Sequence, residues 1–346
     1  MKPHCTMQPL NTRHPSNAKG FSLIEISVVL GVISVLMLVV YSIMDQTLRV
    51  TMFNESHNDL TTMTQRATNT LQTEIVQARQ VFQEDSDGAA YRAALQIPSR
   101  YSAWTTTLLP VIQSDTTLTP DSATRFTGNS LLIVRQLEPI SINYDDDGDS
   151  NTPDIEFLAD RYRFEYFFLS PTSTRTFSSS AYTLDLLQST SIEYADYFQL
   201  SALTRPQLQA ISAKLTASGI TTAWNPGQPI ASAFYSIPSS GNWSAAIARP
   251  AIDIASTSSL LPELKGGRIS GRMDYSVAFG SYPLPLPIAK FAKPDASLPA
   301  FPSGFEVKIA GPAKSRKVMT RVLMMARYGI NTYEAQQGFV TTSANF

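Results

Sequence analysis

The most apolar part of the chain runs without interruption from residue 21 to residue 44. It contains one charged residue, Glu25, and is otherwise apolar or small. As an α-helix this segment would be about 36 Å long, enough to cross a hydrocarbon core of about 30 Å. Basic residues precede it and mainly acidic residues follow it, so the positive-inside rule places residues 1–20 in the cytoplasm and the rest of the chain beyond the inner membrane. The pattern predicts a single membrane-spanning helix over residues 21–44.

A second pattern continues the helix beyond the membrane. Apolar residues recur at spacings of three and four, which indicates one stripe of an amphipathic helix: Leu60, Met63, Ala67, Leu71, Ile75, Ala78 and Phe82. No proline occurs between Phe21 and Phe82, so we expect an unkinked helix over residues 45–85, ended by the turn residues Asp85 to Gly88. The stripe alone also suits a free coiled-coil stalk.

The remainder, residues 86–346, alternates apolar and polar positions as β-strands do. Such runs cover residues 130–137, 161–169, 273–279, 305–309 and 318–328. The length and the methionines of the last run would also suit a helix, but Gly311-Pro312 stands at a hairpin-like distance from the run before it and favours a strand. The expected fold class is α+β, a long N-terminal helix with a β-rich globular head.

One helix interrupts the strand pattern. Thr204 is a suitable N-cap with Gln207 three residues later, Pro206 lies in the first turn, and Gly219 would end the helix. We place this helix in an insertion over about residues 170–267, rich in serine and threonine. The insertion is either a lobe that carries specificity or a set of surface loops.

A proline-rich segment follows over residues 282–305. Its six prolines exclude a central strand and a helix: Pro283, Pro285, Pro287, Pro294, Pro299 and Pro302. The segment is either a loop draped over the head or a docking segment for a partner.

The most specific feature of the sequence is the order of residues where the apolar segment begins. The run Lys19-Gly20-Phe21-Ser22-Leu23-Ile24-Glu25 closes a polar leader with glycine, opens the apolar segment with phenylalanine and has glutamate as its fifth residue. An ordinary secretory signal has its cleavage site after the apolar segment, which the mature protein then loses. The run resembles the class III signal of type IV pilins and type II secretion pseudopilins.

This resemblance implies how the segment is processed and used. A prepilin peptidase would cut after Gly20, and the new N-terminal nitrogen of Phe21 would be methylated. Glu25 would pair with the N-terminal ammonium of a neighbouring subunit during filament assembly. A carboxylate in a membrane helix costs roughly 2.5–3.5 kcal/mol on insertion scales and usually marks a function, which argues against a plain anchor. The expected fold is type IV pilin-like, with residues 45–85 packed on a sheet of the head.

The length of the chain narrows the implied role. Its 346 residues exceed the length of most major pilins and favour a minor, specialised subunit, similar to PilW-like minor pilins. Such a subunit would sit at or near the tip of a type IV pilus and assemble with other minor pilins on an inner-membrane platform. Its head would lie first in the periplasm and then at the cell surface. The alternatives are a J-type pseudopilin of a type II secretion filament and a membrane-anchored binding protein or adhesin outside any filament.

Removal of the leader changes the charge and the thiol content. Of the 27 basic residues, 24 remain after Lys2, Arg13 and Lys19 are lost, against 28 acidic residues, which leaves a net charge of −4. This net charge lacks the excess of basic residues that is typical of nucleic-acid-binding proteins. The only cysteine, Cys5, also lies in the leader, so the mature chain has no disulfide and the head must be held by its core.

Residues suited to catalysis are scarce. The only mature histidine, His57, lies on the stem, where we expect a surface side chain. The mature chain has no thiol nucleophile, no zinc-ligand set and no phosphate-binding glycine loop, and nothing singles out an acid pair for glycoside cleavage. A small basic cluster of Lys314, Arg316 and Lys317 suits a solvated hairpin, or less well a contact with DNA or lipid. We therefore expect no enzyme and no required cofactor.

The one dense cluster of metal-ligating residues lies between residues 143 and 156. Acids at alternate positions of a turning loop can supply the six to eight oxygens that Ca²⁺ prefers. A register from Asp145 has Ser150 where the sharp turn needs glycine, whereas a register from Asn143 has Gly148 there. Neither register has amphipathic helices on both sides, so we expect a structural calcium loop between strands, with a solvated acidic turn as the alternative. The candidate ligands are Asn143, Asp145, Asp147, Asp149, Asn151, Asp154 and Glu156.

Overall fold

The chain divides into two compact units, Met1–Phe53 and Asn54–Phe346. The long helix α1 (Leu23–Val76) begins in the first unit and ends in the second. The computed structural model describes residues 22–101, 107–114, 118, 126–145, 154–178, 181–260, 273–277, 291–292, 303–312, 315–328 and 332–344.

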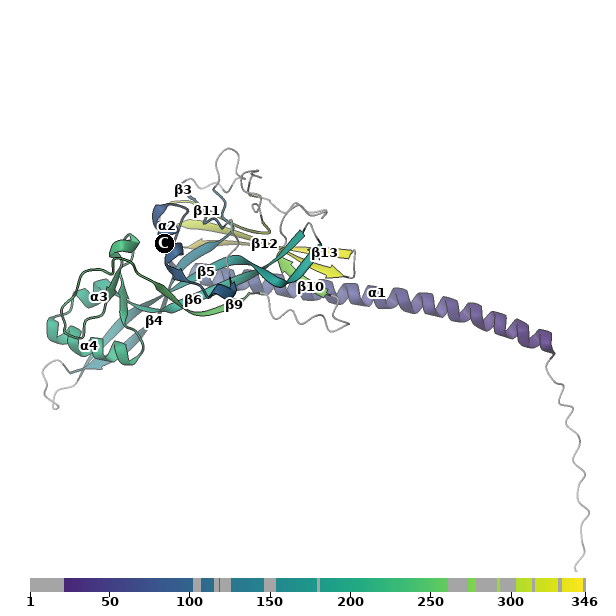
Figure 1. The fold of residues 1–346 in the computed structure, drawn as a ribbon, viewed down its shortest axis with the longest axis horizontal. Helices are drawn as coiled ribbons and strands as arrows, with labels where there is room; N and C mark the ends of the chain where they lie inside the picture. Colours follow the sequence, from purple (N-terminus) through teal and green to yellow (C-terminus); the bar gives the residue numbers. More distant parts are fainter. Residues whose placement is uncertain are drawn as a thin grey trace, which may run out of the picture. The chain divides into compact units, whose positions relative to one another are not determined.

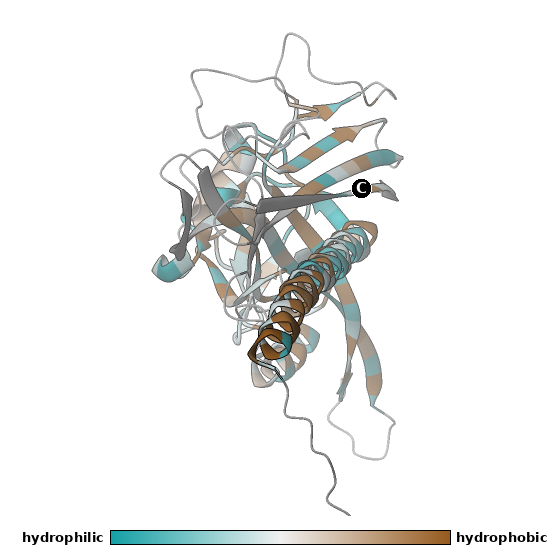
Figure 2. Cartoon of the chain, turned by 90° about the vertical axis from the view of Figure 1, so that its right-hand side faces the viewer, coloured by the Kyte–Doolittle hydropathy of each residue, from teal (hydrophilic) through white to brown (hydrophobic). Residues whose placement is uncertain are grey.

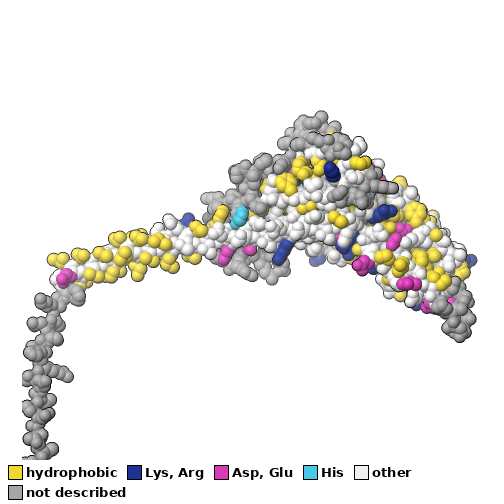
Figure 3. Space-filling model, turned by 180° about the vertical axis from the view of Figure 1, so that it is seen from behind, with side chains coloured by type: hydrophobic (Ala, Val, Ile, Leu, Met, Phe, Trp, Pro, Cys, Tyr) yellow, Lys and Arg dark blue, Asp and Glu magenta, His cyan; other side chains and the backbone are white. Residues whose placement is uncertain are grey.

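The first unit is the apolar half of α1. Among the described residues, α1 is the one helix that is long and apolar enough to cross a membrane, and its most apolar stretch is not buried in the protein. Hydrophobic side chains cover this half in Figure 3, and the same half is brown in Figure 2. A helix that is hydrophobic all round suits a membrane span, so this unit fits membrane anchoring.

In the second unit, the rest of α1 packs on the head. Leu60, Leu71 and Ile75 of the apolar stripe are fully buried. They belong to one hydrophobic core with Ile133 and Phe167 of the sheet. The stripe therefore faces the head, as expected from the resemblance, and does not form a free coiled-coil stalk.

The helix ends earlier than the sequence predicts. α1 stops at Val76, and Ala78–Val81 form strand β1, which pairs antiparallel with β4 (Leu131–Tyr144). β1 still buries Ala78, and Phe82 just beyond it is buried as well. Two buried positions four residues apart suit either element, so the spacing could not locate the boundary. Pairing with β4 satisfies the backbone polar groups of this stretch and decides for a strand.

The turn residues predicted to end α1 begin another helix instead. The Asp85 side chain accepts a hydrogen bond from the Gly88 N–H at 2.8 Å and caps α2 (Ser86–Ala94). Aspartate favours helix starts as well as turns because its carboxylate accepts from a free backbone N–H in both. The same four residues therefore suited both interpretations.

The head is built on a sheet with 13 strands among the described residues. Its main path is β1-β4-β5-β6-β10-β12-β11-β3 (Figure 1). The strands that follow β4 on this path are β5 (Ile155–Ser178), β6 (Ala181–Asp196), β10 (Met273–Val277), β12 (Arg316–Tyr328), β11 (Phe305–Ala310) and β3 (Ile112–Gln113). β13 (Thr332–Ala344) pairs along β12, and β9 (Ile252–Ser259) pairs with β6 and with β2 (Leu95–Gln96), which precedes a short 3₁₀ turn (Ser99–Tyr101).

Each of the five predicted runs overlaps a strand, namely β4, β5, β10, β11 and β12, and residues 278–279 of the third run lie outside the described residues. The ambiguous last run, residues 318–328, is strand β12 and pairs antiparallel with β11 across the predicted Gly311-Pro312 turn. The α+β class expected from the sequence is confirmed.

Successive residues of β4 and β5 point to opposite faces of the sheet, which separates two cores. Leu131 and Ile133 lie in the core beneath α1. Leu132 and Val134 lie in a second core, which includes Phe164 and the fully buried Trp224. The sheet therefore has α1 on one face and α2 with its neighbouring loops on the other.

A helical lobe packs on the outer part of the β4–β5 hairpin. It contains α3 (Tyr197–Ser201), α4 (Arg205–Ala217), β7 (Thr222–Trp224), a 3₁₀ turn (Ile230–Ser232) and β8 (Phe234–Ser236). α4 is the predicted helix, with the capping box of Thr204 and Gln207 formed and Gly219 at a positive φ of 82°. Strands β6 and β9, which fall inside the expected insertion of residues 170–267, belong to the main sheet, so the lobe is smaller than that range.

The proline-rich segment is described at residues 291–292 and 303–305. The backbone N–H groups of Phe291 and Ala292 donate to Glu306 Oε1 at 3.0 and 2.9 Å. The Phe291 ring also lies 6.2 Å from the Phe339 ring of β13. This part of the segment is therefore anchored to the head.

Candidate functional site

The first candidate site is the start of α1. The Ser22 N–H donates to Glu25 Oε2 at 2.9 Å, and the Glu25 N–H donates to Ser22 Oγ at 3.2 Å. This reciprocal pair is a capping box, which satisfies two of the four N–H groups left free at a helix start. Glu25 therefore has a local role in addition to the one that the resemblance implies. Gly20 and Phe21 lie outside the described residues.

The surroundings of Glu25 decide what its charge can do. The neighbouring side chains Leu23, Ile24 and Ile26 are exposed and apolar. A carboxylate in such a setting favours a cationic partner, because a lone charge in an apolar medium is costly. An ammonium group on an adjacent chain would meet this requirement.

The second candidate site is a row of charges on the sheet, on the face that α1 covers. Arg135 of β4 lies opposite Arg163 of β5, which lies opposite Glu193 of β6. Like charges directly opposite each other destabilise a sheet, so the two arginines need acidic partners. Arg163 Nη2 donates to Glu165 Oε1 at 2.8 Å, and Arg135 Nη1 donates to Glu74 Oε2 of α1 at 2.8 Å.

The two acids beneath this row are close to each other. Glu165 is fully buried, and Glu74 is 9% exposed. Burial and the nearby Glu165 carboxylate raise the pKa of Glu74 from 4.5 to about 7, although Arg135 opposes the shift. Glu74 belongs to the head unit and lies well beyond the apolar segment of residues 21–44. The acid pair therefore carries less than two full negative charges near neutral pH.

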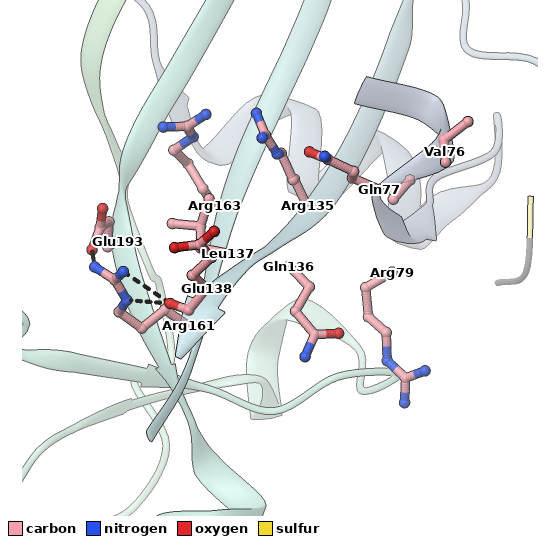
Figure 4. A pocket seen from close by; sticks show the side chains of 11 residues that line it. Val76, Gln77, Arg79, Arg135, Gln136, Leu137, Glu138, Arg161, Arg163 and Glu193 are labelled. Atoms are coloured by element: carbon pink, nitrogen blue, oxygen red, sulfur yellow. Dashed lines mark hydrogen bonds and ion pairs between the residues drawn. The ribbon is translucent and has the colours of Figure 1, made fainter. Parts of the chain in front are cut away.

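The row continues into a groove of about 680 Å³ just past the end of α1 (Figure 4). Besides backbone and apolar parts, its charged and amide lining consists of Gln77, Arg79, Arg135, Gln136, Glu138, Arg161, Arg163 and Glu193. Figure 4 shows the Arg161 guanidinium between Glu193, at 2.6 Å, and the Glu138 carbonyl, at 2.9 and 3.0 Å. Arg79 is exposed and has no hydrogen bond or ion pair among the described residues.

The predicted metal ligands lie at the end of the β4–β5 hairpin. Asn143 of β4 pairs with Glu156 of β5, and Glu156 Oε1 accepts a hydrogen bond from Ser141 Oγ at 2.6 Å. Asp145 and Asp154 are exposed, whereas Asp147, Asp149 and Asn151 lie outside the described residues. The described part of the chain contains no group of three or more acidic, histidine or cysteine side chains placed to hold a metal ion.

The other sequence candidates lie apart from the groove. His57 is exposed on α1, as expected for a surface histidine. Arg316 donates to the Gly311 carbonyl across the β11–β12 turn, and Lys317 is exposed beside it, which suits the solvated hairpin. Lys314 lies outside the described residues.

Sequence reasoning did not find the groove. The alternation over residues 161–169 predicted a strand and assigned no function to Arg161 or Arg163. The pairing of β4, β5 and β6 is what brings the charged residues together. They are Arg135, Arg161, Arg163, Glu165 and Glu193. The alternation of arginine at positions 161 and 163 was the one local signal.

Comparison with known proteins supports the reading of the first site. Residues 15–41 match the prokaryotic N-terminal methylation motif, which includes Gly20, Phe21 and Glu25. No curated protein and no solved structure matches the chain significantly. The motif implies processing by a prepilin peptidase and assembly with other pilins, and it indicates a structural subunit rather than an enzyme. The N-terminal segment of this chain is therefore a class III, prepilin-type signal of the kind that type IV pilins and pseudopilins carry.

Proposed function

We propose that this protein is a minor pilin that enters or primes a type IV pilus at or near its tip. The observation that carries the proposal is the prepilin-type motif over residues 15–41, joined by one continuous helix to a large β-rich head. The head would contact other minor pilins or surface partners, and an inner-membrane assembly platform would insert the subunit.

The role proposed for Glu25 is to pair with the N-terminal ammonium of the adjacent subunit. The capping box holds its carboxylate at the first turn of α1, four residues along the chain from Phe21, which cleavage after Gly20 would make the chain end. Glu25 would then balance a positive charge that the membrane disfavours as strongly as a negative one.

The test compares two changes at this turn. Glu25→Ala removes the charge and the hydrogen bond that its carboxylate accepts, whereas Ser22→Ala removes only the hydroxyl that accepts from the Glu25 N–H and keeps the charge. We expect Glu25→Ala to remain cleaved and membrane-bound but to fall at least about tenfold in sheared filaments, as expected for the loss of a charge pair. Ser22→Ala should still be incorporated.

The outcome separates the classes of protein. Incorporation of Glu25→Ala at the wild-type level would contradict the assembly role. Absence of the wild-type chain from sheared filaments, with correct cleavage, would favour a membrane-anchored binding protein. Loss of protein secretion without loss of pili on deletion would favour a J-type pseudopilin of a type II secretion filament.

We further propose that the hairpin end over residues 143–156 holds a structural Ca²⁺. The support is the sequence, which has carboxylates at positions 145, 147 and 149, with Asp154 directly before β5 and Glu156 within it. The pairing of Asn143 with Glu156 brings the two ends of the loop together, which any loop site of this kind requires.

A further inference from the structure

The arginine groove carries more donors than its own acids use. An arginine has five N–H donors in a rigid fork. Among the described residues, Arg163 donates twice to Glu165, Arg135 donates once to Glu74, and Arg161 donates once to Glu193 and twice to the Glu138 carbonyl, which leaves part of each fork unused. Arg79 makes no hydrogen bond or ion pair there. The groove can therefore accept additional negative groups.

The arginines are regularly spaced. Arg161 and Arg163 are two residues apart on β5 and point to the same face, which separates their Cα atoms by roughly 6.8 Å. Arg135 lies opposite Arg163 on the neighbouring strand. An extended peptide with acidic residues at alternate positions has the same repeat, so consecutive carboxylates could meet consecutive guanidinium groups.

The rest of the lining favours a peptide over a nucleic acid. Glu138 and Glu193 alternate with the arginines, so the lining suits separated carboxylates better than a continuous chain of phosphates, and the net charge of the chain is −1. The side-chain amides of Gln77 and Gln136 can instead bond to a peptide backbone, because each offers a donor and an acceptor. Complementary charges across such a contact would give it specificity and fix its register.

We propose that this groove binds an extended acidic segment of another filament subunit, with carboxylates at alternate positions. Arg161 and Arg163 would meet successive carboxylates and the exposed Arg79 a further one, while Glu74 and Glu165 hold Arg135 and Arg163 in place. That the segment belongs to another filament subunit rests on the proposed function. That it carries carboxylates at alternate positions is inferred from the groove alone.

The test uses the full-length chain in detergent and a fluorescent nine-residue peptide in which glutamate and threonine alternate. We expect it to bind at least about tenfold more tightly than the same peptide with glutamine, and more weakly at high salt. The double variant Arg79→Gln/Arg161→Gln should weaken binding by about fivefold or more, since it removes two charged donors. Arg249→Gln, an exposed arginine outside the groove, should leave it unchanged.

Several results would overturn the proposal. Equal binding of the two peptides would show that carboxylates are not recognised. Unchanged binding by the double variant, with its thermal midpoint retained, would place the contact elsewhere. A single-stranded oligonucleotide that displaces the glutamate peptide at equal concentration would contradict the choice of a peptide. Self-association lost in the double variant would assign the groove to a second copy of this chain.

This experiment and the test of assembly fail independently. Peptide binding does not require a filament, so its failure leaves the result for Glu25→Ala standing. Failure of Glu25→Ala to reduce incorporation would instead remove the proposed source of the segment and leave the peptide result intact.

Discussion

Arg321 of β12 and Glu306 of β11 form an ion pair of 2.9 Å in which both side chains are fully buried. Glu306 also accepts the backbone N–H groups of Phe291 and Ala292, and Arg321 Nε donates to Gln337 of β13. The pair therefore joins β11, β12, β13 and residues 291–292 at one point. Such a pair survives in the interior only when further hydrogen bonds satisfy its remaining atoms, as they do here.

The first prediction follows from this pair. Glu306→Leu should lower the free energy of unfolding by about 3–5 kcal/mol, because it leaves a buried guanidinium without its counter-charge. The double variant Glu306→Leu/Arg321→Met should recover most of this loss, since no charge then remains unpaired. Urea unfolding of the full-length chain in detergent checks both, and a double variant as unstable as the single one would contradict the argument.

The second prediction concerns the contact between β13 and α1. A Cβ atom at Gly338 would lie 2.6 Å from Cγ2 of both Thr64 and Thr68, much closer than real contacts. Gly338→Ala should therefore cost about 1–3 kcal/mol by overpacking. Adding Thr64→Ser and Thr68→Ser removes the two methyl groups but keeps the hydroxyls that donate to α1 carbonyls, and should restore stability. No rescue would mean that the strain lies elsewhere.

The third prediction is a pH dependence that arises from Glu74. Its pKa is raised from 4.5 to about 7, so between these values the native state keeps a proton that the unfolded state has released. The free energy of unfolding should therefore fall as pH rises from about 4.5 to about 7, and the contribution should level off above that. Glu74→Gln removes this titration and should flatten the profile. Parallel profiles of the two proteins would contradict the shift.

The fourth prediction tests calcium. Ca²⁺ at about 100 times its dissociation constant should stabilise the head by about 2.7 kcal/mol, and chelation should reverse this. The gain should appear as a rise of several degrees in the thermal midpoint and be lost in Asp147→Asn/Asp149→Asn. Mg²⁺, which retains its waters and needs fewer acids, serves as the control. No shift on adding Ca²⁺ to stripped protein would favour a solvated acidic turn.

The fifth prediction tests processing. The membrane-extracted protein should begin at Phe21 with one added methyl group, and Gly20→Val should retain the leader, because the family's peptidase needs a small residue beside the scissile bond. Intact mass and N-terminal sequencing distinguish the two forms. Leu23→Ile, three residues beyond the bond, is the control. Normal cleavage of Gly20→Val would rule out the prepilin reading.

The sequence predicted the local features of the fold well. The stripe from Leu60 to Ile75 and the capping box at Thr204 each depend on residues within one helix, so their spacing carries the information. The predicted end of α1 was wrong, because the pairing of β1 with β4, more than 50 residues away, decides where the helix stops. A pattern of neighbouring residues contains no information about a strand so far away in the sequence.

The two candidate sites differ in the same way. The signal around Glu25 is contiguous and could be recognised from seven residues. The groove is lined by residues from four strands: Arg79 of β1, Arg135 of β4, Arg161 of β5 and Glu193 of β6. The buried acids that pair with its arginines are Glu74 of α1 and Glu165 of β5. Such a cluster requires the strand register, which the sequence did not provide.

The contact of Glu306 with Phe291 and Ala292 has a consequence for the long connection between Val277 and Phe305. A contact near the middle of a connection divides it into two shorter segments. Each segment then has its own entropic cost of bringing its two ends together. A change in the number of residues before Phe291 then leaves the closure after Ala292 untouched. One carboxylate thus divides a single connection into two parts whose lengths can change separately.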